Sequence, residues 1–158
     1  MKQKLTYSLW DVLLASTVQP ISEEKRQRQL TRMYIALDQI EKGDKPTVDD
    51  LALVSDAVEL TNRFYFSDEI RHDLNELMEE IIGARRALLD AYLRHEKGLS
   101  IRLSGPGMQA VRSVMDRYYS LLAVVPERTV LKLHRETELA NIRSLKAGNA
   151  VILKGAAS

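Results

Sequence analysis

The sequence predicts an all-α protein, a bundle of about five helices with one long central helix. Two observations lead to this fold class. Apolar residues recur every three or four positions from about residue 21 to residue 145, which is the spacing of one helix face. Glycines and prolines interrupt this pattern at intervals, where helices end and begin. With 158 residues, the chain has the length of one ordinary domain.

We divide the chain into an N-terminal segment (1–20), a helical domain (21–148) and a C-terminal tail (149–158). Leu9 and Leu13 fall on one helical side of the N-terminal segment. This segment is therefore either a short helix that completes the core or an arm that packs on a partner. The tail is either a small docking segment or a frayed chain end.

Two amphipathic helices are expected before residue 66. The first starts after Ser22, whose hydroxyl can accept hydrogen bonds from the free amides of a helix start, and it ends at Gly43. The second follows Thr47 as its cap. Asp49 and Asp50 lie in its first turn, where they suit the positive end of the helix dipole.

The longest predicted helix runs from Ser67 to Gly98. About 30 residues at a rise of 1.5 Å each would span about 45 Å. Gly83 lies inside this stretch, where it can bend the helix, allow close packing against a neighbour or split the helix in two. A helix of this length needs neighbours from end to end, which antiparallel helices of the same chain or a second subunit can supply. We expect self-association, as a homodimer.

Two more helices follow a short extended stretch at residues 99–103. The first of them opens with Pro106 in its first turn, where amide protons lack partners. Pro126 separates it from the last helix, which Gly148 closes.

The composition excludes several classes of protein. The chain has no cysteine, so disulfides, thiolate metal sites and a cysteine nucleophile are ruled out. No stretch approaches the roughly 20 apolar residues of a membrane span, and we find no signal peptide at the N-terminus. We therefore expect a cytoplasmic protein that does not contact a membrane.

No group of residues has the spacing that catalysis or metal binding requires. Glu69 and His72 match the Glu-x-x-His pattern of carboxylate-bridged metal pairs, but such sites need two copies, and neither His95 nor His134 has a carboxylate three positions earlier. We expect all three histidines on the surface. The sequence thus predicts no enzymatic activity, no metal and no cofactor.

The net charge of +1 hides an uneven distribution. Residues 46–83 hold ten acids and two arginines, whereas thirteen lysines and arginines face six acids from residue 84 onward. Acidic and basic faces can meet within the fold or across a dimer, or one of them can bind a charged partner.

The acidic stretch suggests a protein-binding face whose carboxylates imitate a nucleic-acid backbone in a basic groove of another protein. This hypothesis requires carboxylates that are exposed, clustered and unpaired. The candidate residues are Asp49, Asp56, Glu59, Asp73, Glu76 and Glu80.

The alternative is nucleic-acid binding by basic residues, because mobile cations bind phosphates. Lys25, Arg26, Arg28 and Arg32 can line one side of the first helix. The two C-terminal helices lack the compact helix-turn-helix pattern but are rich in cations. The candidate residues there are Arg112, Arg117, Arg128, Lys132, Arg135, Arg143 and Lys146.

Four short runs carry a resemblance to a known family: Leu-Asp-Gln-Ile (37–40), Thr-Val-Asp-Asp-Leu (47–51), Asp-Ala-Val-Glu-Leu (56–60) and Leu-Ser-Gly-Pro-Gly-Met-Gln-Ala (103–110). They resemble a family of short helical proteins of undefined role encoded in proteobacterial prophages and plasmids. The resemblance covers most of residues 29–145, and the N-terminal segment and apolar tail depart from it. It implies an accessory protein of a mobile element and supplies no active-site residues.

We therefore expect a non-enzymatic interaction protein of a phage or plasmid. Its expected partner is a host macromolecule, such as a defence or transcription component that it would inhibit. The alternative is a nucleic-acid-binding regulator that uses the basic C-terminal helices.

Overall fold

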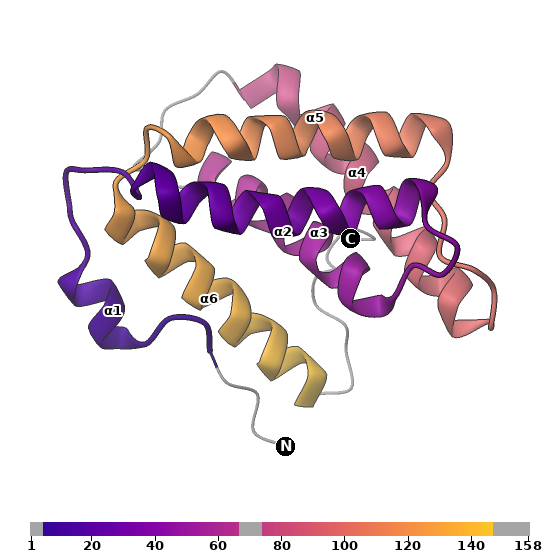
Figure 1. Cartoon of the computed structure of the whole chain (residues 1–158), viewed down its shortest axis with the longest axis horizontal. Coiled ribbons are helices and arrows are strands. Elements are labelled where there is room, and N and C mark those ends of the chain that lie inside the picture. The colour runs from indigo at the N-terminus through magenta and orange to yellow at the C-terminus, as the bar shows by residue number, and fades with distance from the viewer. Residues whose placement is uncertain (1–4, 67–73, 147–158) are drawn as a thin grey trace.

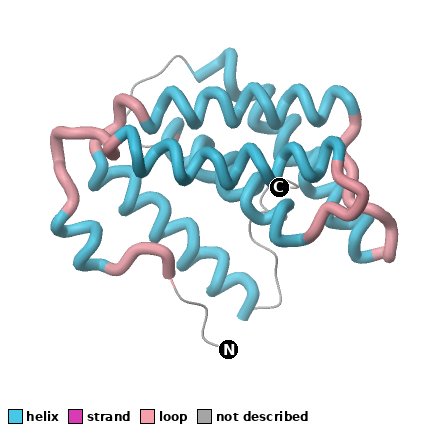
Figure 2. The backbone as a smooth tube through the Cα atoms, viewed as in Figure 1, coloured by secondary structure: helices cyan, strands magenta, loops and turns pink. Residues whose placement is uncertain are grey.

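The computed structural model describes residues 5–66 and 74–146, with the side chains of 74–76 and 141–146 outside this description. The all-α prediction is confirmed, and no strand forms in the described residues (Figures 1 and 2). The helices of the described part are α1 (Leu9–Leu14), α2 (Glu23–Lys42), α3 (Val48–Tyr65), α4 (Leu74–Glu96), α5 (Gly105–Leu122) and α6 (Glu127–Lys146).

The centre of the bundle is α3, which packs against α2, α4, α5 and α6. Residues 57–61 of this helix are all buried, so α3 is covered around its whole circumference. The longest described helix is α4, with 23 residues. Phe64 of α3 stacks on Tyr118 of α5 in the main core.

Three predicted helix starts are confirmed by their caps. The hydroxyl of Ser22 accepts a hydrogen bond from the amide of Lys25. Thr47 accepts from the amide of Asp50, whose carboxylate accepts in return from the amide of Thr47 at 2.9 Å. At the start of α5, the hydroxyl of Ser104 accepts a hydrogen bond from the amide of Gly107. Each hydroxyl satisfies an amide that has no partner within its helix.

Gly83 leaves α4 continuous and faces α5. A Cβ atom built on Gly83 would lie 3.4 Å from the Cβ of Ala110, about an ordinary contact, whereas one built on Gly107 would lie only 2.7 Å from the Cβ of Ala87. Glycines and alanines therefore face one another along this helix pair. Residues 67–73, where the long helix was predicted to start, lie outside the described residues.

The loop between α4 and α5 contributes to the core without pairing as a strand. Gly98 adopts a φ of 75°, a left-handed conformation that ends α4. Ile101 is then buried in the main core. The predicted extended stretch at 99–103 is thus an anchored loop in the structure.

The N-terminal segment contains a short helix that docks on α6 (Figure 1). Val12 and Ala15 bury their side chains against Leu131, in a cluster separate from the main core. Arg128 donates from its guanidinium to the backbone oxygens of Val12 (3.2 Å) and Leu13 (2.5 Å). The segment thus contains the short helix of the first alternative, although its apolar contacts lie outside the main core. The C-terminal tail at 149–158 lies outside the described residues.

Candidate functional site

A pocket of about 430 Å³ lies between α2 and α6. Both helices pack near α3 but diverge from each other, as Figure 1 shows. The N-terminal segment closes one side of the gap with Thr6 and Tyr7. Apolar side chains of several elements complete the lining: Ile21, Met33, Leu53 and Leu131.

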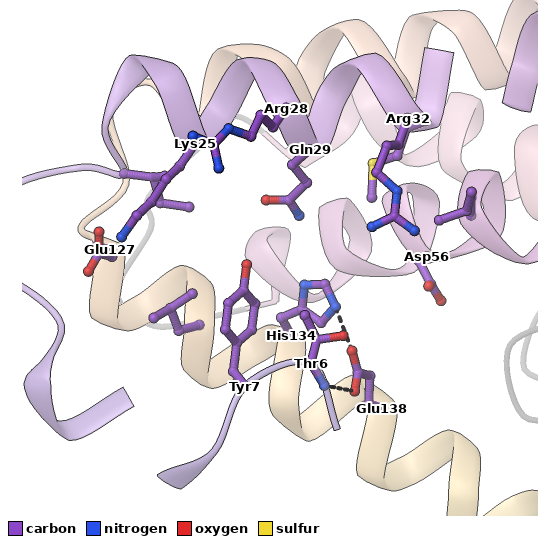
Figure 3. A pocket seen from close by; sticks show the side chains of 14 residues that line it. Thr6, Tyr7, Lys25, Arg28, Gln29, Arg32, Asp56, Glu127, His134 and Glu138 are labelled. Carbon is purple, nitrogen blue, oxygen red and sulfur yellow. Dashed lines mark hydrogen bonds and ion pairs between the residues drawn. The ribbon is translucent and has the colours of Figure 1, made fainter. Parts of the chain in front are cut away.

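The α2 side of the pocket is basic. Lys25, Arg28 and Arg32 are three and four positions apart, so they share one face of the helix, and all three are exposed. In Figure 3, Arg32 points from α2 toward Asp56 of α3. Gln29 lies between these cations and donates to the hydroxyl of Tyr118 at 2.8 Å.

The opposite side of the pocket contains an imidazole–carboxylate pair on α6. Nε2 of His134 lies 2.8 Å from Oε1 of Glu138, and the amide of Thr6 donates to the other oxygen of Glu138 at 2.9 Å. The ring of Tyr7 meets His134 edge-on, with 5.1 Å between centroids. These contacts fasten the N-terminal segment to α6.

His134 is buried, with 8% of its surface exposed, so the prediction of a surface histidine was wrong. The N-terminal segment covers this face of α6, which the sequence pattern did not reveal. Nδ1 of His134 has no hydrogen-bond partner within the described residues. His95 is exposed as predicted, and His72 lies outside the described residues.

Two carboxylates of the pocket respond differently to burial. Burial raises the pKa of Asp56 to about 6; His134 opposes this shift, while Glu138 and Glu59 add to it. Burial would also raise the pKa of Glu138, but the hydrogen bonds from His134 and Thr6 outweigh it and leave that pKa lowered. Ionising Asp56 therefore costs free energy in the folded protein, whereas the charged form of Glu138 is stabilised by its hydrogen bonds.

A second surface feature is an apolar patch on the N-terminal segment. Leu9, Trp10, Leu13 and Leu14 of α1 are exposed, with 72% of Trp10 and 82% of Leu14 accessible. The acid of this helix, Asp11, is engaged in its capping box with Ser8. We call these four apolar side chains the N-terminal apolar patch.

The predicted acidic face is divided by the fold. Glu59 is buried and paired with Arg85 at 2.7 Å, and Asp56 is partly buried in the pocket, so neither belongs to an exposed face. Both point inward because α3 is the central helix. Asp49 and Glu80 are exposed on α3 and α4. The side chains of Asp73 and Glu76 lie outside the described part of the structure.

The predicted basic residues of α5 and α6 are also dispersed. Arg112 pairs with Glu41 of α2, and Arg128 binds the end of α1. Arg117 and Lys132 are exposed, whereas Arg135 is partly buried. The side chains of Arg143 and Lys146 lie outside the described residues.

The pocket was not predicted from the sequence. The basic residues between Lys25 and Arg32 were predicted to share one side of a helix, and most of these residues line the pocket. Its other polar groups come from the N-terminal segment, α3 and α6, which are distant in the chain. No spacing rule connects Tyr7, Asp56 and His134, so no local signal was there to be found.

Comparisons with models of known protein families, with curated proteins and with solved structures found no match. Within the described residues, no group of acids and histidines is arranged to hold a metal ion. No helix of the described part has the length and apolar character needed to cross a bilayer.

Proposed function

We propose that this chain is a non-enzymatic interaction protein that binds a host protein through the N-terminal apolar patch. The observation that carries the proposal is the exposure of Trp10 and Leu14 beside Leu9 and Leu13 on one short helix. Exposed apolar clusters of this kind mark interaction sites, and tryptophan is enriched among the residues that dominate binding energy.

The patch is held in position before any partner arrives. The amides of Glu127 and Arg128 donate to the backbone oxygens of Gln19 (2.8 Å) and Ser16 (2.9 Å), and the guanidinium of Arg128 holds the end of α1. A fixed helix loses less conformational entropy on binding than a free arm does. This anchoring supports a role in recognition.

The resemblance to prophage and plasmid proteins supports the setting that we propose. In that setting the chain acts in the bacterial cytoplasm as an accessory protein of a mobile element, and its target is a host defence or transcription component. The nucleic-acid-binding alternative has less support, because Arg112 and Arg128 are engaged with other parts of the protein.

Affinity capture from a nuclease-treated proteobacterial lysate tests the proposal. The wild-type chain is expected to retain a specific host protein that the double variant Trp10→Ala/Leu14→Ser does not retain. Ile35→Ser is the matched control, because Ile35 is an exposed apolar residue on α2, outside the patch. Capture of the same proteins by all three chains would contradict the proposal, as would salt-sensitive binding of DNA alone.

A further inference from the structure

The pocket between α2 and α6 has a cation and an acid at each end. In Figure 3, the Lys25 side chain extends toward Glu127 at one end, and Arg32 points toward Asp56 at the other end. Within the described residues, none of these four side chains takes part in an ion pair. Arg32 and Asp56 therefore keep charges of opposite sign that a bound molecule can use.

A buried polar atom belongs to the lining of the same pocket. Nε2 of His134 is bonded to Glu138, while Nδ1 has no partner within the described part of the chain. In Figure 3 this second nitrogen is on the side of the ring below Gln29. If the ring is neutral and donates from Nε2, Nδ1 is an acceptor that lacks a donor. Buried polar atoms without partners cost stability, so such an atom is a reason to expect a ligand.

The rest of the lining is apolar. Ile21, Met33, Leu53 and Leu131 line the pocket together with the ring of Tyr7. A volume of about 430 Å³ is in the range of small-molecule sites, which combine an apolar lining with a few fixed polar groups.

We propose that this pocket binds an α-amino acid with an apolar side chain. The carboxylate of the ligand lies against Arg32, and its ammonium group lies against Asp56 and Nδ1 of His134. The side chain of the ligand covers the apolar lining. A zwitterion supplies a counter-charge to both Arg32 and Asp56, whereas a ligand with a single charge leaves one of them without a counter-charge.

The electrostatics of Asp56 agree with this arrangement. Burial raises the pKa of this carboxyl to about 6, so its charged form is poorly stabilised in the empty pocket. The titratable and charged groups around it are His134 and Glu138 of α6, Glu59 of α3 and, in Figure 3, Arg32 of α2. An ammonium group beside Asp56 would favour the charged form.

Isothermal titration calorimetry of the full chain with four probes tests the proposal. L-Phenylalanine carries both charges and an apolar side chain. L-Phenylalaninamide lacks the carboxylate, N-acetyl-L-phenylalanine lacks the ammonium group, and glycine lacks the side chain. We expect L-phenylalanine to bind at least about tenfold more tightly than each of the other three, a difference of about 1.4 kcal/mol.

Two variants locate the site. Arg32→Gln and Asp56→Asn are each expected to weaken the binding of L-phenylalanine by about tenfold or more. Arg102→Gln removes an exposed cation of the α4–α5 loop, away from the pocket, and is expected to change nothing. Circular dichroism of each variant checks that it is folded.

Three results would overturn the proposal. The first is no measurable heat with L-phenylalanine. The second is equal binding of the four probes, which would show that neither the two charges nor the side chain is recognised. The third is binding that persists in both Arg32→Gln and Asp56→Asn, which would place it elsewhere. Because Trp10 and Leu14 do not line the pocket, the outcome is independent of the test of the N-terminal apolar patch.

Discussion

At the residue scale, Asp56 shows how burial determines the cost of a charge. Its carboxyl is partly buried in the pocket and has no ion pair within the described residues. Its neighbour Glu59 is more deeply buried but has Arg85 at 2.7 Å. Both pKa values are raised by burial, and Arg85 opposes the shift at Glu59. Among the described residues Asp56 has no such partner, so its charge weakens the fold at neutral pH.

We predict that Asp56→Asn stabilises the protein at pH 7.5 by about 1 to 3 kcal/mol and has little effect at pH 4. The pKa of Asp56 is about 6 in the folded state and 3.8 as a model value. Because the folded pKa is the higher one, the stability that the protonated carboxyl provides is complete below about pH 4. It is lost as the pH rises through 6.

Urea unfolding of wild type and Asp56→Asn across this pH range measures the difference. Asp44→Asn is the control, because Asp44 is exposed in the loop before α3. A stabilisation that becomes larger on acidification would have the wrong sign for a raised pKa.

At the element scale, the packing of α4 on α5 depends on residues that lack side-chain bulk. Gly107 faces Ala87 so closely that an added Cβ would lie 2.7 Å from the alanine Cβ. Gly105, two positions earlier in the same helix, has open space around it. The two glycines thus differ in packing although both lie in the first turn of α5.

We predict that Gly107→Ala lowers the free energy of unfolding by about 1 to 3 kcal/mol, because α4 and α5 must move apart to accommodate a methyl group. Gly105→Ala is the matched control and is expected to be neutral or slightly stabilising, since alanine favours the helix. Thermal denaturation of the two variants compares them directly. Equal melting temperatures would show that the helix pair is not tightly packed at Gly107.

One arginine side chain of α6 holds the end of α1. Arg128 donates to two backbone oxygens at the end of α1, where the helix dipole favours a cation. Few apolar residues support this docking, since the cluster beneath α1 consists of Val12, Ala15 and Leu131 with Tyr7 beside it.

We predict that Arg128→Ala releases α1 while the main bundle stays folded. Trp10 is the only tryptophan of the chain, so its fluorescence anisotropy reports on α1 alone. The anisotropy is expected to fall in Arg128→Ala and to stay unchanged in Lys132→Ala, an exposed cation of the same helix. Unchanged anisotropy in both variants would mean that the guanidinium of Arg128 is not needed to hold α1.

At the scale of the whole molecule, apolar side chains remain exposed on the outer face of α4. Met78, Ile82 and Leu93 are four and eleven positions apart, which places them on one side of the helix. Isolated apolar residues are common on protein surfaces, but a row along the longest described helix is suited to a symmetric contact with a second copy.

We predict that the protein is a homodimer in solution and that Ile82→Glu shifts it toward the monomer by placing a charge in the interface. Sedimentation velocity measures the change. Trp10→Ala serves as the control and is expected to leave the dimer intact. A wild-type chain that is monomeric at all accessible concentrations would contradict this prediction.

The sequence by itself determined most of the helices and where they start. Ser22 and Thr47 cap helices where predicted, because capping depends on contacts within three residues. Only the tertiary structure decided which polar residues are buried. His134 and Glu59 are covered by elements distant in the chain, and the pocket joins four separate segments. Periodicity shows which residues share a helix face, but it does not show which other element covers that face.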